Sequence, residues 1–454
     1  MCDSQNYITD KSGMEGLSQL FSSGCKPEEQ WRIGTEHEKI GFCVDSLKPI
    51  PYAGTRSIQS LLTLLAKRSG RPLFENDTII AIQKQLASIT LEPGGQLELS
   101  GAPLATIHET CMETQNHLTL LKEATEKLGI GFLGLGFQPK WGRDQIPWMP
   151  KARYAVMKEY MPMVGDSGLD MMLRTATVQA NLDFSSEADM ARKMRVACSL
   201  QPLVTALCAA SPFVDGKPSG FLSSRAACWL DTDPARTGVP ECIFEHDFGF
   251  ESYTEWALDA PMYFILRNGQ YINCAGQSFR AFLQGKLPAL PGELPTMDDW
   301  ELHTGTLFPE VRLKQFLEMR GADAGQWPWV CALPALWKGV LYDEQALEQA
   351  WILCSDWSHA EVSQLRQEVP RLAFSTPFRE TDAHALCETM LDIARGGLER
   401  IADLNSHGED ESIFLKPMIH AVTSRKTQAE QWLDAYHGSW NGNIDRIFVE
   451  AMHP

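Results

Sequence analysis

Two carboxylates stand one residue apart in residues 32–42 (RIGTEHEKIGF). Alternate side chains of an extended strand point to the same face, so Glu36 and Glu38 project together, roughly 7 Å apart. Two parallel carboxylates repel each other and are costly to bury. A Mg²⁺ ion between them removes that cost, because Mg²⁺ prefers oxygen ligands. The segment therefore indicates one wall of a magnesium site, with a solvated polar face on an edge strand as the alternative.

A second pair of acids follows in residues 88–100 (SITLEPGGQLELS), where apolar and polar residues alternate on both sides of a Pro-Gly-Gly turn. Proline fixes φ and glycine accepts a positive φ, so the pattern predicts a β-hairpin. Glu92 and Glu98 flank the turn, and an odd number of loop residues would place them on the same face. Four carboxylates on one sheet face are typical of sites in which Mg²⁺ is shared with nucleotide phosphates.

Eight stretches, spread in one order over nearly the whole chain, resemble the plant and proteobacterial type of glutamate–cysteine ligase. They are GTEHEKIGF (34–42), SITLEPGGQLELSGAP (88–103), GIGFLGLGFQPKW (129–141), MPKARYAVMKEYMP (149–162), GLDMMLRTATVQANLDFSSEADM (168–190), SPFVDGKPSGFLSSR (211–225), DAPMYFILRNG (259–269) and FPEVRLKQFLEMRGAD (308–323). The resemblance implies an α+β fold like that of glutamine synthetase, a curved antiparallel sheet funnel surrounded by helices. It also implies a single catalytic domain over residues 1–454, with a helical C-terminal part from about residue 340.

The activity that the resemblance implies is ATP- and Mg²⁺-dependent ligation of the γ-carboxylate of L-glutamate to L-cysteine through a γ-glutamyl phosphate. This is the first step of glutathione biosynthesis, with two or three Mg²⁺ ions as cofactors and ATP as co-substrate. The phosphoryl group and its attacker are both anions, so cations must dominate catalysis. The alternatives are a carboxylate–amine ligase with another amine acceptor, a magnesium-dependent hydrolase, and an inert binding protein on the same fold.

The resemblance also assigns site residues. The expected metal ligands are Glu36, Glu38, Glu92, Glu98, Gln179 and Glu310. Gln179 has a polar surface strand as its alternative interpretation. On a strand Glu310 would point the same way as Arg312, which would meet phosphate with two parallel N–H groups. Arg174 is the second expected catalytic residue. The expected substrate-binding residues are Arg153 and Arg225 for glutamate, Tyr263 near the cysteine pocket, and Asn181.

The net charge of −18 argues against nucleic acid or an anionic membrane as a partner. No apolar run approaches the roughly 20 residues that a membrane span needs. The first residues have neither the basic nor the apolar region of a secretory signal. We therefore expect a bacterial, cytoplasmic enzyme, a monomer or homodimer, whose partners are the small molecules glutamate, cysteine and ATP.

The 12 cysteines include no C-x-x-C pair, which excludes a zinc ribbon or thioredoxin motif. Cys111 and Cys331 occupy the positions of a disulfide in the plant relatives. Cys274 matches one member of a second disulfide, but Ala289 stands where its partner would be. In a reducing cytosol we expect Cys111 and Cys331 to be thiols.

Periodicity and capping signals predict helices near residues 57–68, 104–128 and 185–211, strand over 129–139, a loop over 285–299 and helices from about residue 342. Gly129, Gly131 and Gly134 match the dinucleotide fingerprint G-x-G-x-x-G. A helix precedes the glycines and Pro139 follows them, whereas the fingerprint needs a strand before and a helix after. We therefore expect these glycines to permit close strand packing instead.

Overall fold

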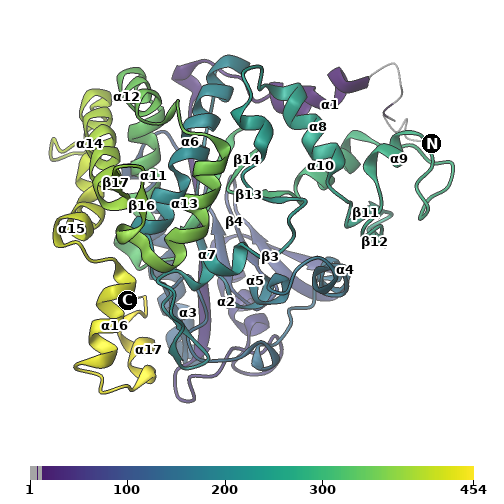
Figure 1. The fold of residues 1–454 in the computed structure, drawn as a ribbon. Helices are drawn as coiled ribbons and strands as arrows, with labels where there is room; N and C mark the ends of the chain where they lie inside the picture. Colours follow the sequence, from purple (N-terminus) through teal and green to yellow (C-terminus); the bar gives the residue numbers. More distant parts are fainter. Residues whose placement is uncertain (1–7, 9–12, 454) are drawn as a thin grey trace.

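A nine-stranded sheet organises the computed structural model, which describes residue 8 and residues 13–453 (Figure 1). The first residues, where we expect no secretory signal, lie outside the described part. Every pairing in this sheet is antiparallel. The strand order is β14-β15-β7-β1-β5-β4-β3-β2, and β6 pairs with β1. The strands are β1 Ile33–Cys43, β2 Arg71–Glu75, β3 Thr78–Gln83, β4 Ser88–Leu91, β5 Leu97–Ser100, β6 Ile130–Leu133, β7 Thr177–Leu182, β14 Val311–Leu313 and β15 Leu317–Asp323.

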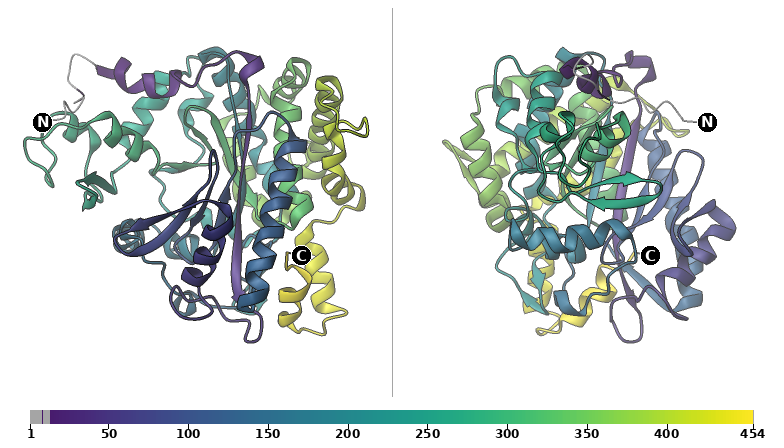
Figure 2. Two further views of the ribbon diagram at one scale, coloured as in Figure 1. Left: turned by 180° about the vertical axis from the view of Figure 1, so that it is seen from behind. Right: turned by 90° about the vertical axis from the view of Figure 1, so that its right-hand side faces the viewer.

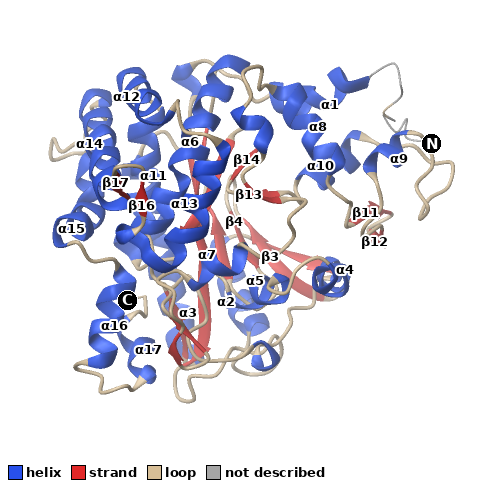
Figure 3. Ribbon diagram, viewed as in Figure 1, coloured by secondary structure: helices blue, strands red, loops and turns tan. Residues whose placement is uncertain are grey.

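Helices cover the sheet on the side that carries the larger hydrophobic core, and the strands fan out beside them (Figure 3). Those nearest the sheet are α3 Ile107–Leu128, α6 Glu187–Leu207 and α11 Trp327–Leu341. Outside them lie α12 Glu344–Cys354, α13 His359–Leu372, α14 Ala383–Ile401 and α15 Lys416–Ser424 of the helical C-terminal part. Its last helices are α16 Gln428–His437 and α17 Ile447–Glu450, and α17 packs directly on the end of β1. The expected α+β architecture is therefore confirmed.

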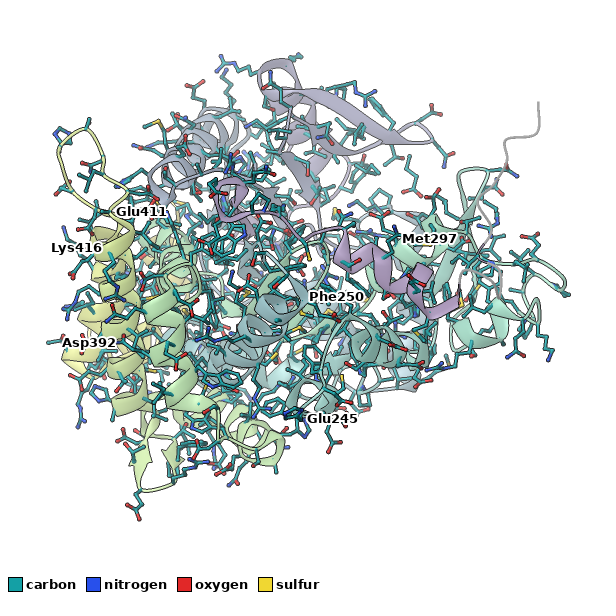
Figure 4. All side chains as sticks on the ribbon, turned by 90° about the horizontal axis from the view of Figure 1, so that it is seen from above. Glu245, Phe250, Met297, Asp392, Glu411 and Lys416 are labelled. Carbon is teal, nitrogen blue, oxygen red and sulfur yellow. A yellow bond between two sulfur atoms is a disulfide. The ribbon has the colours of Figure 1, made fainter. Side chains whose placement is uncertain are left out.

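Shorter elements lie on the opposite side of the sheet. They are α4 Ala152–Tyr160, α5 Gly168–Arg174 and α7 Ser224–Trp229. The helix α2 Ile58–Ser69 instead packs beside α3 on the side of the long helices. An arm projects beside the shorter elements (Figure 2) and contains α8 Phe250–Asp259, β11 Phe264–Arg267, β12 Gln270–Asn273, α9 Phe279–Leu283 and α10 Met297–Thr304. Seen from above, Met297 of the arm and Asp392 of α14 lie on opposite sides of the molecule (Figure 4). The remaining elements include α1 Gly13–Ser22 and the short pair β10 Thr237–Gly238 and β13 Phe308–Pro309.

Helix boundaries follow the capping signals closely. The Ser57 side chain accepts a hydrogen bond from Ser60 N at the start of α2, and Thr106 and Glu109 form a capping box at the start of α3. The helix α6 ends at Leu207, four residues before the expected end. The chain leaves the helix there because Ala210 N and Ser211 Oγ donate to the buried Asp323 carboxylate, at 2.9 and 2.6 Å.

The glycine fingerprint is structural, as predicted. The strand β6 that contains Gly131 pairs with β1, and no helix follows it directly. A Cβ on Gly134 would lie 2.5 Å from the carbonyl oxygen of Gly325, so only glycine fits this close approach. Among the described residues, no helix is long and apolar enough to cross a membrane.

The structure corrects the expectation that Cys111 and Cys331 are thiols, because they form a disulfide. The helices α3 and α11 pack side by side and bring the two Cα atoms to 5.6 Å, within the range that a disulfide spans. The bond joins residues 220 positions apart, so it removes much of the conformational freedom of the unfolded chain.

Reduction with dithiothreitol should lower the melting temperature by about 5 °C, because a disulfide that closes a long loop contributes about 2–5 kcal/mol. Differential scanning fluorimetry with and without the reductant measures the shift. The Cys111→Ala variant should melt at the temperature of the reduced protein and should not respond to reductant. An unchanged melting temperature for reduced wild-type protein would contradict the prediction.

Candidate active site

A cavity of about 260 Å³ lies on the face of the sheet opposite the larger core. We call it the main cavity. The strands β1, β5, β7 and β15 form one wall, and α4, α5, α7 and residues 305–308 form the other. The expected site residues that line it are Glu36, Glu38, Glu92, Glu98, Gln179, Arg153, Arg225 and Arg312. The structure thus brings together the two acidic segments and three of the expected arginines.

The strand register explains how the carboxylates meet. Glu38 is paired with Glu98 across β1 and β5, and Glu36 is paired with Gln179 across β1 and β7. Glu92 lies in a five-residue loop between β4 and β5, held by hydrogen bonds between its backbone and Gln96 O and Gly95 N. The odd loop length places Glu92 and Glu98 on the same face, as predicted.

Burial shapes the acidity of these carboxyl groups. Burial and the nearby Glu318 and Glu98 carboxylates raise the pKa of Glu36 to about 8. Burial, followed by the charges of Glu92 and Glu98, raises the pKa of Glu38 well above its usual value. The groups are partly satisfied by protein donors, since Asn181 Nδ2 donates to Glu36 and Thr177 N to Glu38, both at 2.9 Å. Full ionisation of these carboxyl groups therefore needs more positive charge than the protein places beside them.

The Arg312 side chain faces a carboxylate that the sequence analysis missed. Its Nε and Nη2 donate to the two oxygens of Glu318 at 2.7 and 3.0 Å, and Nη1 donates to the carbonyl oxygens of Gly305 and Leu307. The two parallel donors expected to meet phosphate are thus already occupied. Burial alone would raise the pKa of Glu318, but Arg312, Lys314 and Arg320 hold it well below its usual value.

Arg320 is the second missed residue. It lines the main cavity and donates from Nη1 to Gln179 Oε1 at 2.7 Å and to Glu318 Oε2 at 2.8 Å. The signal was present in the sequence, because alternation in Leu-Glu-Met-Arg (317–320) puts Glu318 and Arg320 on one face of a strand.

Four expected site residues lie outside the main cavity lining. Asn181 is next to it, through its hydrogen bond to Glu36. The Tyr263 hydroxyl instead donates to Asp233 at 3.0 Å, and its ring packs 3.7 Å from the Arg236 guanidinium. Tyr263 is buried in the hydrophobic cluster that contains Tyr160 at the end of α4.

Arg174 and Glu310 are engaged in ion pairs away from the acidic wall. Arg174 donates to Asp170 at 3.3 Å and to Asp215 at 2.6 Å. Glu310 pairs with Arg366 at 2.5 Å and lines a smaller adjoining cavity of about 20 Å³. The expectation that Glu310 and Arg312 point the same way fails, because Glu310 stands at the break between β13 and β14.

The donor set suits a hard cation that brings other oxygen ligands with it. Within the described part of the chain, no group of three or more His, Cys, Asp or Glu side chains is arranged to hold a metal ion by itself. Mg²⁺ typically binds one or two carboxylates and completes its shell with water and substrate phosphates. Excess carboxylate charge without a complete protein shell fits that behaviour.

The raised pKa of Glu36 predicts a pH-dependent stability of the metal-free protein. Between the unfolded pKa near 4.5 and the folded pKa of about 8, the folded state binds the proton more tightly, so stability falls as pH rises. Glu36→Gln should flatten this dependence and raise the melting temperature at pH 8 by about 2 °C or more. Thermal unfolding in chelator from pH 5 to 8.5 measures it.

The control is Glu388→Gln, which changes an exposed glutamate of α14 and should leave the pH profile unaltered. A Glu36→Gln profile parallel to that of the wild type would show that Glu36 titrates normally in the folded protein.

Comparison with known proteins identifies the family to which this chain is similar. Residues 32–450 match the family model described as glutamate-cysteine ligase family 2 (GCS2). A chloroplastic glutamate–cysteine ligase of Brassica juncea is 52% identical over 98% of this chain and 85% of its own length. That of Arabidopsis thaliana is 51% identical over 98% of this chain and 84% of its own length. These chloroplastic names contradict the expected cytoplasmic location.

A solved structure of glutamate–cysteine ligase from Francisella tularensis in complex with AMP superposes with a TM-score of 0.54. It covers 93% of this chain and 87% of its own, at 13% sequence identity, and so shows a shared fold. The family match and the identity to the plant enzymes extend over the strands that carry the acidic wall. The chain belongs to the glutamate–cysteine ligase family 2.

Proposed function

We propose that the main cavity joins the γ-carboxylate of glutamate to the amine of cysteine at the expense of ATP. This ligation is the activity of the family and the first step of glutathione synthesis. The observation that carries the proposal is a single cavity that has four glutamates on its sheet wall and the arginines Arg153 and Arg225 on the facing wall. Such a cavity suits a reaction in which cations must bring two anions together.

The acidic wall is the proposed binding site for Mg²⁺, held by Glu36, Glu38, Glu92, Glu98 and Gln179 together with the phosphates of ATP. A bound ion supplies positive charge to the transferred phosphoryl group. Glu310 is left out of this set, because it is paired with Arg366 outside the main cavity. Glu318 lies on β15 close enough to raise the pKa of Glu36, but its two oxygens accept hydrogen bonds from Arg312 and Arg320, so its role is to hold these arginines.

The arginines of the opposite wall are the proposed contacts for the glutamate substrate. The Nε group of Arg153 is buried without a hydrogen-bond partner in the described structure, and so is that of Arg225. A buried donor without a partner is costly, and a carboxylate ligand would satisfy it. Both residues occupy the positions that the resemblance assigned to glutamate binding.

In the proposed sequence of steps, the γ-carboxylate oxygen attacks the γ-phosphorus of ATP, and ADP leaves. The cysteine amine then attacks the acyl carbon, the C–N bond forms and phosphate departs. The chain contributes orientation, because Arg153 and Arg225 fix the glutamate. Arg320 is held by Glu318 and Gln179 and faces the site of phosphoryl transfer. No covalent enzyme intermediate is needed.

A coupled assay for ADP should detect turnover only when glutamate, cysteine and Mg²⁺ are all present. In that assay Glu38→Ala should reduce kcat by a factor of about 10² or more, because one buried charge contact in phosphoryl transfer is worth roughly that much. Circular dichroism checks that the variant folds. ADP formation without cysteine would favour a hydrolase instead, and a fully active Glu38→Ala would remove Glu38 from the metal shell.

Arg153→Ala should raise the KM for glutamate about tenfold or more while changing the KM for cysteine by less than about twofold, since a charge-assisted contact to one substrate is lost. Steady-state kinetics with each substrate varied in turn give both constants. The matched control is Lys158→Ala on the exposed side of α4, which should change neither. An equal rise in both constants would contradict the assigned contact.

A further inference from the structure

Arg366 contacts two segments that border the main cavity, although it belongs to the helical C-terminal part. It lies on α13, and its Nε donates to Glu310 Oε1 at 2.5 Å. Its Nη2 donates to the carbonyl oxygen of Trp229 at 3.1 Å. Both partners of the ion pair are largely buried, with 16% of the Arg366 side chain and 12% of Glu310 exposed. The side chain thus bridges two segments that are about 80 residues apart in the sequence.

The first contact leads to Arg320. The carbonyl oxygen of Glu310 accepts a hydrogen bond from Arg320 N at 3.0 Å. Arg320 lies in a register shift between Met319 and Ala322, where β15 bulges away from β7. Bulges redirect side chains, and here the Arg320 guanidinium turns toward Gln179. Glu310 therefore holds the backbone of the residue whose side chain enters the cavity.

The fit at this bulge is close. A Cβ on Gly321 would lie 2.5 Å from Glu310 Oε2 and 2.4 Å from Gln201 Nε2, so the position admits only glycine without rearrangement. The Glu310 carboxylate is therefore packed against the bulge itself. Arg366 keeps it there, because a buried carboxylate without a paired cation would be strongly destabilised.

The second contact leads to Arg225. Trp229 is the last residue of α7, and Arg225 lies one turn earlier in the same helix. Arg225 Nη2 donates to the carbonyl oxygen of Arg320 at 2.7 Å. Arg225 and Arg320, two of the four arginines that line the main cavity, are thus joined directly by this hydrogen bond and indirectly through Arg366.

From these contacts we infer that Arg366 is a positioning residue for the ligation. It holds Arg225, on α7, and Arg320, on β15, at a fixed separation across the main cavity. It acts through Glu310 and Trp229 and does not itself line the cavity. This role rests on the proposed function in one respect, namely that Arg225 and Arg320 contact the reacting groups. A misplacement of about 1 Å in such groups can cost about 10²-fold in rate.

The test is Arg366→Met, which keeps the aliphatic stem and removes both polar contacts. We expect kcat/KM for glutamate to fall about 10- to 100-fold, with the KM for cysteine within about twofold of wild type. Arg366→Lys should recover part of the loss, because its ammonium reaches Glu310 but cannot bond Trp229 at the same time. The control is Arg371→Met, an exposed arginine on the same helix, with wild-type kinetics expected.

A second variant separates positioning from metal binding. Glu310→Gln keeps the shape of the side chain, and its effect on kcat/KM should not add to that of Arg366→Met, since both variants break the Arg366–Glu310 ion pair. The Mg²⁺ concentration for half-maximal activity should be unchanged in both variants. Full additivity, a Mg²⁺ requirement raised by Glu310→Gln alone, or wild-type kinetics in Arg366→Met would each overturn the inference. Absence of ligation in wild-type protein would instead refute the proposed function.

Discussion

The structure depends on the burial of like charges on one face of an antiparallel sheet. Glu36, Glu38 and Glu98 are held against one another by strand register, and burial with mutual repulsion raises their pKa values. A protein gains nothing from such an arrangement unless something neutralises it. Arg153 and Arg225 of the opposite wall supply fixed positive charge, and we propose that divalent ions, which bind together with the nucleotide, make up the remaining deficit.

Glu318 shows how the positive charge is kept in place. Three cationic side chains converge on this fully buried carboxylate, and two of them, Arg312 and Arg320, also line the main cavity. A guanidinium group that is already held by hydrogen bonds on one side loses little conformational entropy when it binds a substrate on the other side. The cavity is therefore organised before any substrate arrives, which is the condition for electrostatic catalysis.

Alternation was enough to predict much of the site. It placed Glu36 with Glu38, and Glu92 with Glu98, because period-two geometry within a strand or hairpin is local. The same alternation places Glu318 and Arg320 on one face of β15. What the sequence could not reveal was where strands stop: the interruption at Glu310 depends on Arg366, more than 50 residues later, and on the bulge at Gly321. Similarly, the family pattern assigned Arg174 and Tyr263 to ligands, whereas tertiary partners engage both elsewhere.

The pairing of β7 with both β1 and β15 has a consequence for how the molecule comes into being. The acidic strands are synthesised first, and the segment that carries their counter-charges emerges from the ribosome more than 200 residues later. Contacts of such large sequence separation form slowly. Until β15 docks, a nascent chain holds unneutralised carboxylates beside apolar strands, so chaperone dependence should be greatest in that interval.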